Sequence, residues 1–216
     1  MHVLFATSYL GPVQQYARLY ACSGAVEERC ESFIKQTYRS RCVILSANGP
    51  LALSLPVVHR GGNQPVGGVE LSMHGNWQKL HWNALVSAYE RSPYFDYYAD
   101  YLRPFYEHPP RLLVDFNAGL RDTVCRLLGI SGRVEPTRSY RREFPGGEDC
   151  RTLISPKRDW RIDPHFRSRP YYQVFGAKYG FVPNLSIADL LFNMGPEARL
   201  VLRDSYVGDN VCSHKS

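Results

Sequence analysis

The segment ESFIKQTYRSRC, residues 31–42, concentrates three cations among residues that favour β-structure. If this stretch is a strand, every second side chain points to the same face. That face would carry Lys35, Thr37, Arg39 and Arg41. Such a face suits a phosphate or carboxylate ligand, because arginine offers two parallel N–H donors to an anion. The alternative is a solvated edge, where basic residues discourage pairing with other strands.

A histidine with aromatic neighbours is the candidate for acid–base chemistry. In NWQKLHWNALVSAYE, residues 76–90, helical spacing places Trp77 and His81 one turn apart on the same face. An imidazole titrates near neutral pH, so His81 is a candidate general acid or base. The alternative is an aromatic core helix in which His81 bonds to a backbone carbonyl.

Polar side chains near the C-terminal end add candidates for ligand recognition. The amide of Gln173 follows two tyrosines, and such groups suit the hydroxyls of a sugar or nucleotide. Asn184 precedes a predicted helix start, where free backbone N–H groups attract anions. Ser186 and Asp189 have the spacing of a capping box, which explains them more simply than a catalytic serine–acid pair.

The cysteines do not indicate a metal site. Six are present and none forms a CxxC pair, so the sequence predicts reduced thiols and a cytoplasmic protein. Cys42 lies beside cations that would lower the pKa of a thiol, yet free cysteines are commonly small buried residues. No apolar run approaches the roughly 20 residues that span a bilayer. No particular cofactor is indicated.

The composition favours anionic partners. The 216 residues carry a net charge of +6, densest between residues 138 and 169. Phosphates, nucleotides, acidic sugars, nucleic acid and membrane surfaces all fit such a charge. No run of five like charges occurs, so a nucleic-acid-binding tail is not indicated. The 15 tyrosines indicate a cleft lined by polar groups.

Hydrophobic periodicity and turn residues predict a single α/β or α+β domain over residues 1–203, followed by a polar, disordered tail at 204–216. A small mixed sheet comes from the N-terminal half, and the C-terminal half is mostly helical. Predicted strands span 2–8, 31–45, 51–58 and 69–72, the second and third joined by a turn at 46–50. Predicted helices span 13–22, 76–90, 93–106 and 111–128, and another begins near 184–189.

Four long stretches together resemble the WbqC-like family. They are TSYLGPVQQYARL, KQTYRSRCVILSANGPLALSLPV, WQKLHWNALVSAYERSPYFDYY and YYQVFGAKYGFVPNLSIADLLFNMGPEA, and they extend the resemblance from about Ser8 to Leu202. One departure is Ser40, where the family usually has asparagine. Members of this family occur in gene clusters for bacterial surface polysaccharide (O-antigen, part of lipopolysaccharide). The resemblance implies site positions at Lys35, Arg39, Arg41, Trp77, His81, Trp82, Gln173, Asn184, Ser186 and Asp189.

The combined expectation is a cytoplasmic transferase acting on a nucleotide- or lipid-linked sugar. The resemblance implies that it transfers glycine or another aminoacyl group to an amino sugar. His81 would be the base, and the ligand would be held by Lys35, Arg39, Arg41, Trp77, Gln173 and Asn184. A non-catalytic protein that binds a sugar nucleotide or scaffolds the same pathway is the second hypothesis. Nucleic-acid binding, which rests on net charge alone, is the third.

Overall fold

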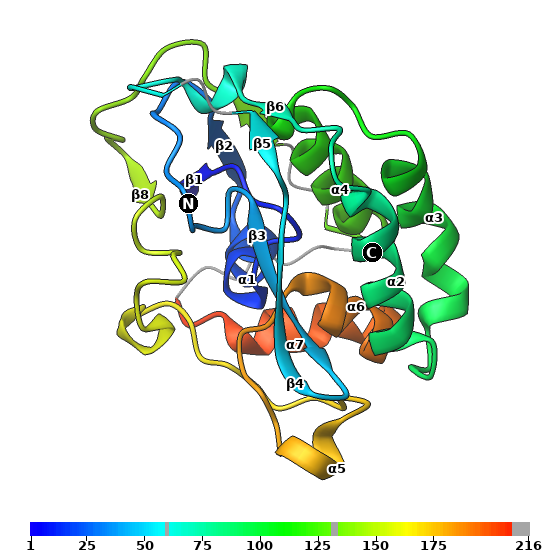
Figure 1. Cartoon of the computed structure of the whole chain (residues 1–216). Helices are drawn as coiled ribbons and strands as arrows, with labels where there is room; N and C mark the ends of the chain where they lie inside the picture. Colours follow the sequence, from blue (N-terminus) through cyan, green and yellow to red (C-terminus); the bar gives the residue numbers. More distant parts are fainter. Residues whose placement is uncertain (59–60, 131–133, 209–216) are drawn as a thin grey trace.

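The computed structural model describes residues 1–58, 61–130 and 134–208. At its centre lies a parallel sheet of four strands in the order β7-β2-β1-β8 (Figure 1). The strands are β1 (His2–Ala6), β2 (Gly24–Glu28), β7 (Val134–Pro136) and β8 (Gly147–Asp149). The middle of β1 is fully buried, as expected for a parallel strand covered on both faces.

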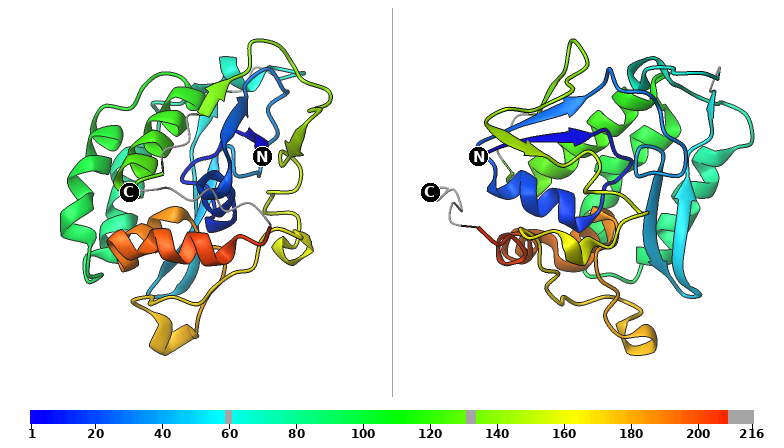
Figure 2. Two further views of the ribbon diagram at one scale, coloured as in Figure 1. Left: turned by 180° about the vertical axis from the view of Figure 1, so that it is seen from behind. Right: turned by 90° about the vertical axis from the view of Figure 1, so that its left-hand side faces the viewer.

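Helix α1 (Val13–Ala21) connects β1 to the neighbouring β2. Figure 2 shows it beneath the sheet, with α6 (Ile187–Met194) and α7 (Ala198–Ser205) on its far side. Eight of its nine residues are buried, because the sheet covers one face and the two C-terminal helices cover the other. The C-terminal part of the chain therefore completes the core around the N-terminal strand.

The remaining helices form a group beside the sheet (Figure 1). They are α2 (Trp77–Tyr89), α3 (Phe95–Glu107) and α4 (Leu113–Leu127), with α2 packed on α3 and α3 packed on α4. Shorter pieces are α5 (Gly176–Tyr179) and the 3₁₀ turns η1 (Val66–Gly68), η2 (Trp160–Ile162) and η3 (Gly195–Glu197). Within the described ranges, no helix is both long and apolar enough to cross a membrane.

Two small antiparallel pairs join these layers. Strands β3 (Arg41–Ser46) and β4 (Gly49–Ser54) form a hairpin, and β5 (Val57–Val58) pairs with β6 (Glu70–Leu71). The hairpin turns at the position expected from the sequence, where Gly49 adopts a φ of 99°. Strand β3 packs against α2 and α6, so the hairpin ties the sheet to the helical group.

The predicted strand over 31–45 is wrong in its first ten residues. Residues 31–40 form a loop, and regular pairing begins only at Arg41. Gln36 has a φ of 57°, which a strand does not allow. The Arg39 guanidinium folds back onto the Glu31 carboxylate, with Nη2 at 2.6 Å from Oε1, and so closes the loop. The alternating face proposed from the sequence therefore does not exist.

The α/β fold class and the single domain are confirmed, and the structure adds that the central sheet recruits β7 and β8 from the second half of the chain. The predicted tail at 204–216 begins too early. Helix α7 runs to Ser205, and Tyr206 forms a β-bridge with Phe166, so residues 204–208 are ordered parts of the fold. The rest of that prediction, 209–216, lies outside the described residues.

Candidate functional site

The carboxyl edge of the parallel sheet is where its topology places a binding site. Numbered by their order along the chain, the four strands lie across the sheet as third, second, first and fourth. The direction of the strand order therefore reverses between β1 and β8. Ligands of open parallel sheets bind outside the carboxyl ends of the strands at such a point. At this edge the chain leaves β2 into the loop of residues 29–40 and leaves β8 into residues 150–159.

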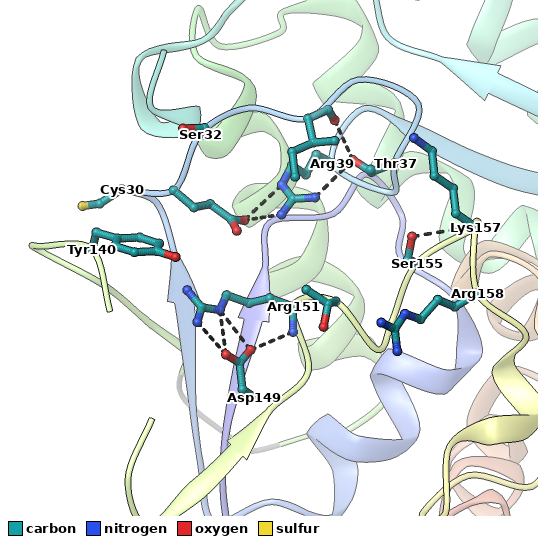
Figure 3. Close-up of a pocket in the computed structure, with 13 residues that line it drawn as sticks. Cys30, Ser32, Thr37, Arg39, Tyr140, Asp149, Arg151, Ser155, Lys157 and Arg158 are labelled. Atoms are coloured by element: carbon teal, nitrogen blue, oxygen red, sulfur yellow. Dashed lines mark hydrogen bonds and ion pairs between the residues drawn. The ribbon is translucent and has the colours of Figure 1, made fainter. Parts of the chain in front are cut away.

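A cavity of about 870 Å³ opens between these two loops (Figure 3). Its volume lies in the range of roughly 300–1,000 Å³ typical of small-molecule sites. The lining residues are mainly polar or charged, and they are Cys30, Glu31, Ser32, Ile34, Thr37, Arg39, Tyr140, Asp149, Arg151, Thr152, Ser155, Lys157 and Arg158.

Positive charge predominates in the cavity. Four cationic and two carboxylate side chains line it, a formal excess of two positive charges. Arg39 is paired with Glu31, and Arg151 donates to Asp149 with Nη2 at 2.5 Å from Oδ2. In the described part of the chain, the side chains of Lys157 and Arg158 have no ion-pair or hydrogen-bond partner. These two cations are therefore free to meet an anion.

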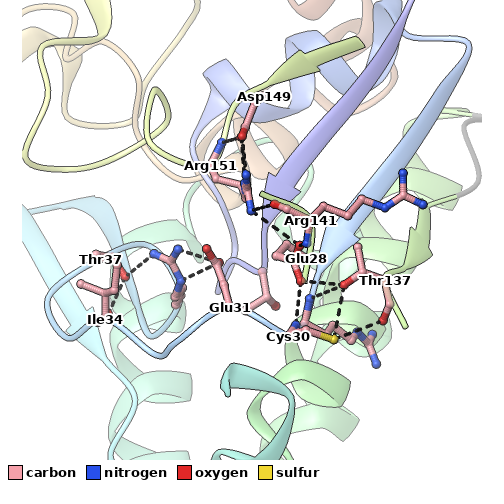
Figure 4. A network of polar contacts seen from close by, with 12 residues as sticks. Glu28, Cys30, Glu31, Ile34, Thr37, Thr137, Arg141, Asp149 and Arg151 are labelled. Carbon is pink, nitrogen blue, oxygen red and sulfur yellow. Dashed lines mark hydrogen bonds and ion pairs between the residues drawn. The ribbon is translucent and has the colours of Figure 1, made fainter. Parts of the chain in front are cut away.

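Buried Glu28 holds the surroundings of the cavity in place (Figure 4). Its Oε1 accepts hydrogen bonds from the Cys30 amide at 2.8 Å and the Thr137 hydroxyl at 2.7 Å. Its Oε2 accepts one from the Arg141 amide at 3.0 Å and lies 3.6 Å from Nη1 of Arg151. One carboxylate thus anchors the start of the loop after β2 and one arginine of the cavity.

The two cavity carboxylates differ in electrostatic setting. Burial raises the pKa of Glu31, and this outweighs the neighbouring Arg39, which lowers it. Burial also acts to raise the pKa of Asp149, but hydrogen bonds from Arg151 hold it below its usual value. The pKa values of the two cavity carboxyl groups are therefore shifted in opposite directions, upward for Glu31 and downward for Asp149.

The chain matches a known protein family over most of its length. The model of the WbqC-like protein family matches residues 8–158, a span that contains every residue lining the cavity. The chain belongs to the WbqC-like family. An uncharacterised protein of Mycobacterium tuberculosis, Rv1507c, is 29% identical over 79% of this chain and 84% of its own length. No solved structure matches.

Of the residues proposed from the sequence, this WbqC-like protein places Arg39 and its neighbour Thr37 among the described lining of the cavity. Lys35 is exposed on the loop, and Arg41 donates from Nε to the Ser54 hydroxyl at 3.1 Å. The sequence reasoning did not find Glu31, Asp149 or the unpaired cations at 157 and 158. The available signals were the basic segment 138–169 and the strands β2 and β8, which were not recognised.

His81 lies in a buried aromatic cluster and not in the cavity. Its Nδ1 is 3.0 Å from the Tyr9 hydroxyl, which also contacts the Tyr106 hydroxyl at 3.0 Å. Trp77 packs edge-on against His81 and donates from Nε1 to the Ser72 carbonyl. Burial lowers the pKa of His81 to about 4, so the imidazole is neutral at pH 7. Its catalytic role stays a prediction, and its geometry is that of a core histidine.

Gln173 and Asp189 form a second buried cluster. The Asp189 carboxylate accepts hydrogen bonds from Tyr89 at 3.0 Å, Tyr171 at 2.7 Å and Gln173 at 2.9 Å. The predicted capping box is therefore wrong. Ser186 does cap α6 by accepting from the Ala188 amide, but the Asp189 side chain faces the core. Burial raises the pKa of Asp189 to about 6, although the three donors lower it.

Asn184 closes the N-terminus of α1. Its Oδ1 accepts a hydrogen bond from the Gln14 amide at 2.9 Å, and the Leu185 carbonyl accepts one from Val13 at 2.9 Å. A phosphate at the first helix of a parallel sheet needs these amides to be free. They are occupied here, so the protein itself fills this helix end.

We expect Asn184→Gly to lower the free energy of unfolding by about 1 kcal/mol, the value of one hydrogen bond. Glycine tolerates the φ of 53° at this position, so the loss reports the side-chain hydrogen bonds between Asn184 and Gln14. Urea unfolding measures it. Asn76→Gly is the matched control, because Asn76 has a φ of 49° and makes no side-chain capping bond. Equal losses of unfolding free energy in both variants would show that the side chain of Asn184 does not stabilise the N-terminus of α1.

Proposed function

We propose that this protein binds a nucleotide-linked sugar in the cavity at the carboxyl edge of the sheet. The observation that carries the proposal is the pair Lys157 and Arg158, whose side chains lie unpaired at the cavity beside the paired Arg39 and Arg151. Hydrogen bonds between such cations and phosphate oxygens are charge-assisted and roughly twice as strong as neutral ones. A diphosphate bridge suits two adjacent cations.

Further features of the cavity fit the other parts of such a ligand. Ser32, Thr152 and Ser155 supply hydroxyl groups that can bond to sugar hydroxyls. Tyr140 is largely exposed at the cavity, and an aromatic ring of this kind stacks on a nucleobase. The volume of about 870 Å³ accommodates a ligand with all three parts.

We further propose that the bound ligand is a substrate, and that the protein is a transferase in the assembly of a bacterial surface polysaccharide. Family membership supports this, because the sequence resemblance implies such a pathway. The cavity also contains a carboxyl group, Glu31, whose pKa burial raises, and shifted carboxyl groups in clefts are candidates for proton transfer. Aminoacyl transfer to an amino sugar is the specific reaction that the resemblance implies.

The binding proposal predicts that UDP-glucose binds the wild-type protein and that Lys157→Gln/Arg158→Gln weakens binding about 100-fold. The physical reason is the loss of two charge-assisted contacts, each worth about 1.5–3 kcal/mol when well formed and less in a solvated cavity. Titration calorimetry measures the affinity. The wild-type affinity should also fall as salt is raised from 50 to 500 mM, because the ions screen the contacts.

The matched control is Arg126→Gln/Arg199→Gln. It removes the same formal charge from exposed positions of α4 and α7, away from the cavity. Retained binding in this control with loss in the cavity variant supports a local site. Equal loss in both would reduce the effect to net charge, and no binding by the wild type would overturn the proposal.

The pathway is tested in cells that lack the gene. Wild-type protein should restore the mass of the surface glycan, whereas folded Lys157→Gln/Arg158→Gln protein should not. Mass spectrometry of the isolated glycan gives the result. A glycan that is unchanged when the gene is removed would overturn the transferase proposal and leave the binding proposal standing.

A further inference from the structure

Glu31 is bound to Arg39 through one oxygen. Arg39 donates to Oε1 from Nε at 3.0 Å and from Nη2 at 2.6 Å. Oε2 accepts no hydrogen bond from the described residues, and the side chain is 11% exposed. Because Glu31 lines the cavity, the unused oxygen is available to a ligand there.

The charged groups around Glu31 oppose one another. Arg39 and Arg151 favour its ionised form, whereas burial and the buried Glu28 favour the protonated form, and the pKa is raised as a result. Asp149, Lys157 and Arg158 and the neutral side chains of Tyr140 and Cys30 line the same cavity. An added negative charge in the cavity would act in the same direction as burial and Glu28, which favour the protonated form of Glu31.

An anionic ligand supplies that charge. A phosphate in the cavity repels the Glu31 carboxylate and competes with it for the Arg39 guanidinium, whose planar fork binds either anion. Two like charges sharing one site cannot both stay ionised at little cost. We infer that Glu31 is the proton-carrying group of this cavity: when a phosphate ester binds, Glu31 takes up one proton from solvent and presents it to the ligand through Oε2.

This inference rests on the proposed function and adds a role for one residue. Arg39 is released from Oε1 to the ligand phosphate, and the proton replaces it as the partner of the carboxylate. The proton enters from buffer and returns to buffer when the ligand leaves, so the binding cycle is balanced. A protonated carboxyl beside a bound phosphate ester has the placement of a general acid.

The test is the pH dependence of UDP-glucose binding. Its diphosphate bridge does not titrate between pH 5.5 and 7.5, so changes in that range belong to the protein. If binding takes up a proton, the ligand favours the protonated form, and wild-type affinity rises as the pH falls. Calorimetry in buffers of different ionisation enthalpy should also show proton uptake on binding.

Glu31→Gln should remove both effects. Its affinity for UDP-glucose should be independent of pH over this range and about 10-fold higher than that of the wild type at pH 7.5, because the repulsion and the competition for Arg39 are gone. Glu107→Gln is the matched control, since Glu107 is an exposed carboxylate of α3 outside the cavity. This variant should keep the wild-type pH dependence.

A second measurement does not depend on substitution. The carbon signal of the Glu31 carboxyl in labelled wild-type protein should titrate at a higher pH with UDP-glucose than without it. Binding with an unshifted Glu31 signal, or Glu31→Gln that keeps the wild-type pH dependence, would overturn this inference and leave the proposed function intact. Absence of UDP-glucose binding would overturn the proposed function itself and the inference with it.

Discussion

Asp163→Ala is expected to lower the free energy of unfolding by about 3–5 kcal/mol, the cost of removing one partner of a buried ion pair. The side chains of Asp163 and Arg18 are both 0% exposed. Arg18 donates to both Asp163 oxygens, from Nε at 3.1 Å and from Nη2, and Gln14 adds a bond at 2.8 Å. Arg18 also contacts Glu148, so α1, β8 and the segment that follows η2 are tied together.

Removal of both charges should lower the free energy of unfolding by less than removal of Asp163 alone. In Asp163→Ala/Arg18→Met no unpaired charge remains in the core, because methionine fills part of the arginine volume. Urea unfolding at pH 7 compares the single and double variants. Asp204→Ala is the control, since Asp204 pairs with Arg203 at the surface and such pairs contribute about 0–1 kcal/mol. If Asp163→Ala lowers the free energy of unfolding no more than this control, the buried Asp163–Arg18 pair does not stabilise the fold as stated.

The second large effect is the loss of stability in acid caused by His81. Its pKa falls from 6.5 to about 4 in the folded protein, so the unfolded state binds more protons between these values. Stability therefore rises with pH across this window and is lost as the pH falls. At 1.36 kcal/mol for each pKa unit, the His81 contribution is about 3 kcal/mol between pH 7 and pH 4.

Unfolding by urea at several pH values from 7 to 4 measures this effect as a difference between proteins. The wild type should lose about 3 kcal/mol more over this range than His81→Gln, which has no titrating ring. Folding raises the pKa of Asp189 to about 6, which changes stability with pH in the opposite direction. This contribution is the same in the wild type and in His81→Gln, so it cancels in their difference. His108→Gln, at an exposed position, should retain the wild-type slope. Parallel profiles for all three would show that His81 is not the group.

Hydrophobic periodicity was enough to locate the long elements. Helices predicted over 13–22, 76–90, 93–106 and 111–128 are observed as α1 to α4 within a few residues. Strand β1 and the β3–β4 hairpin were also expected, because a buried strand and a glycine turn have local signals. Burial of one helix face requires a regular spacing of apolar residues, so this information is present in each segment.

Strands β2, β7 and β8 could not be located in this way. They have five, three and three residues, too few to show a period. They are strands because β1 supplies the backbone partners of β2 and β8, and β2 supplies those of β7. The prediction of a strand at 31–40 failed for a related reason. Its alternating cations resemble a strand face, but the pairing of Arg39 with Glu31, eight residues apart, bends the chain into a loop.

The sequence by itself determined the fold class and the family and predicted an anionic ligand, because composition, periodicity and motif order are properties of the chain alone. Tertiary structure decided which cations lie together in one cavity. Arg39 meets Lys157 and Arg158 only because β2 and β8 end at the same edge of one parallel sheet. Residues more than a hundred positions apart meet through strand order, which no local pattern encodes, so Glu31 and its cavity emerged only from the folded chain.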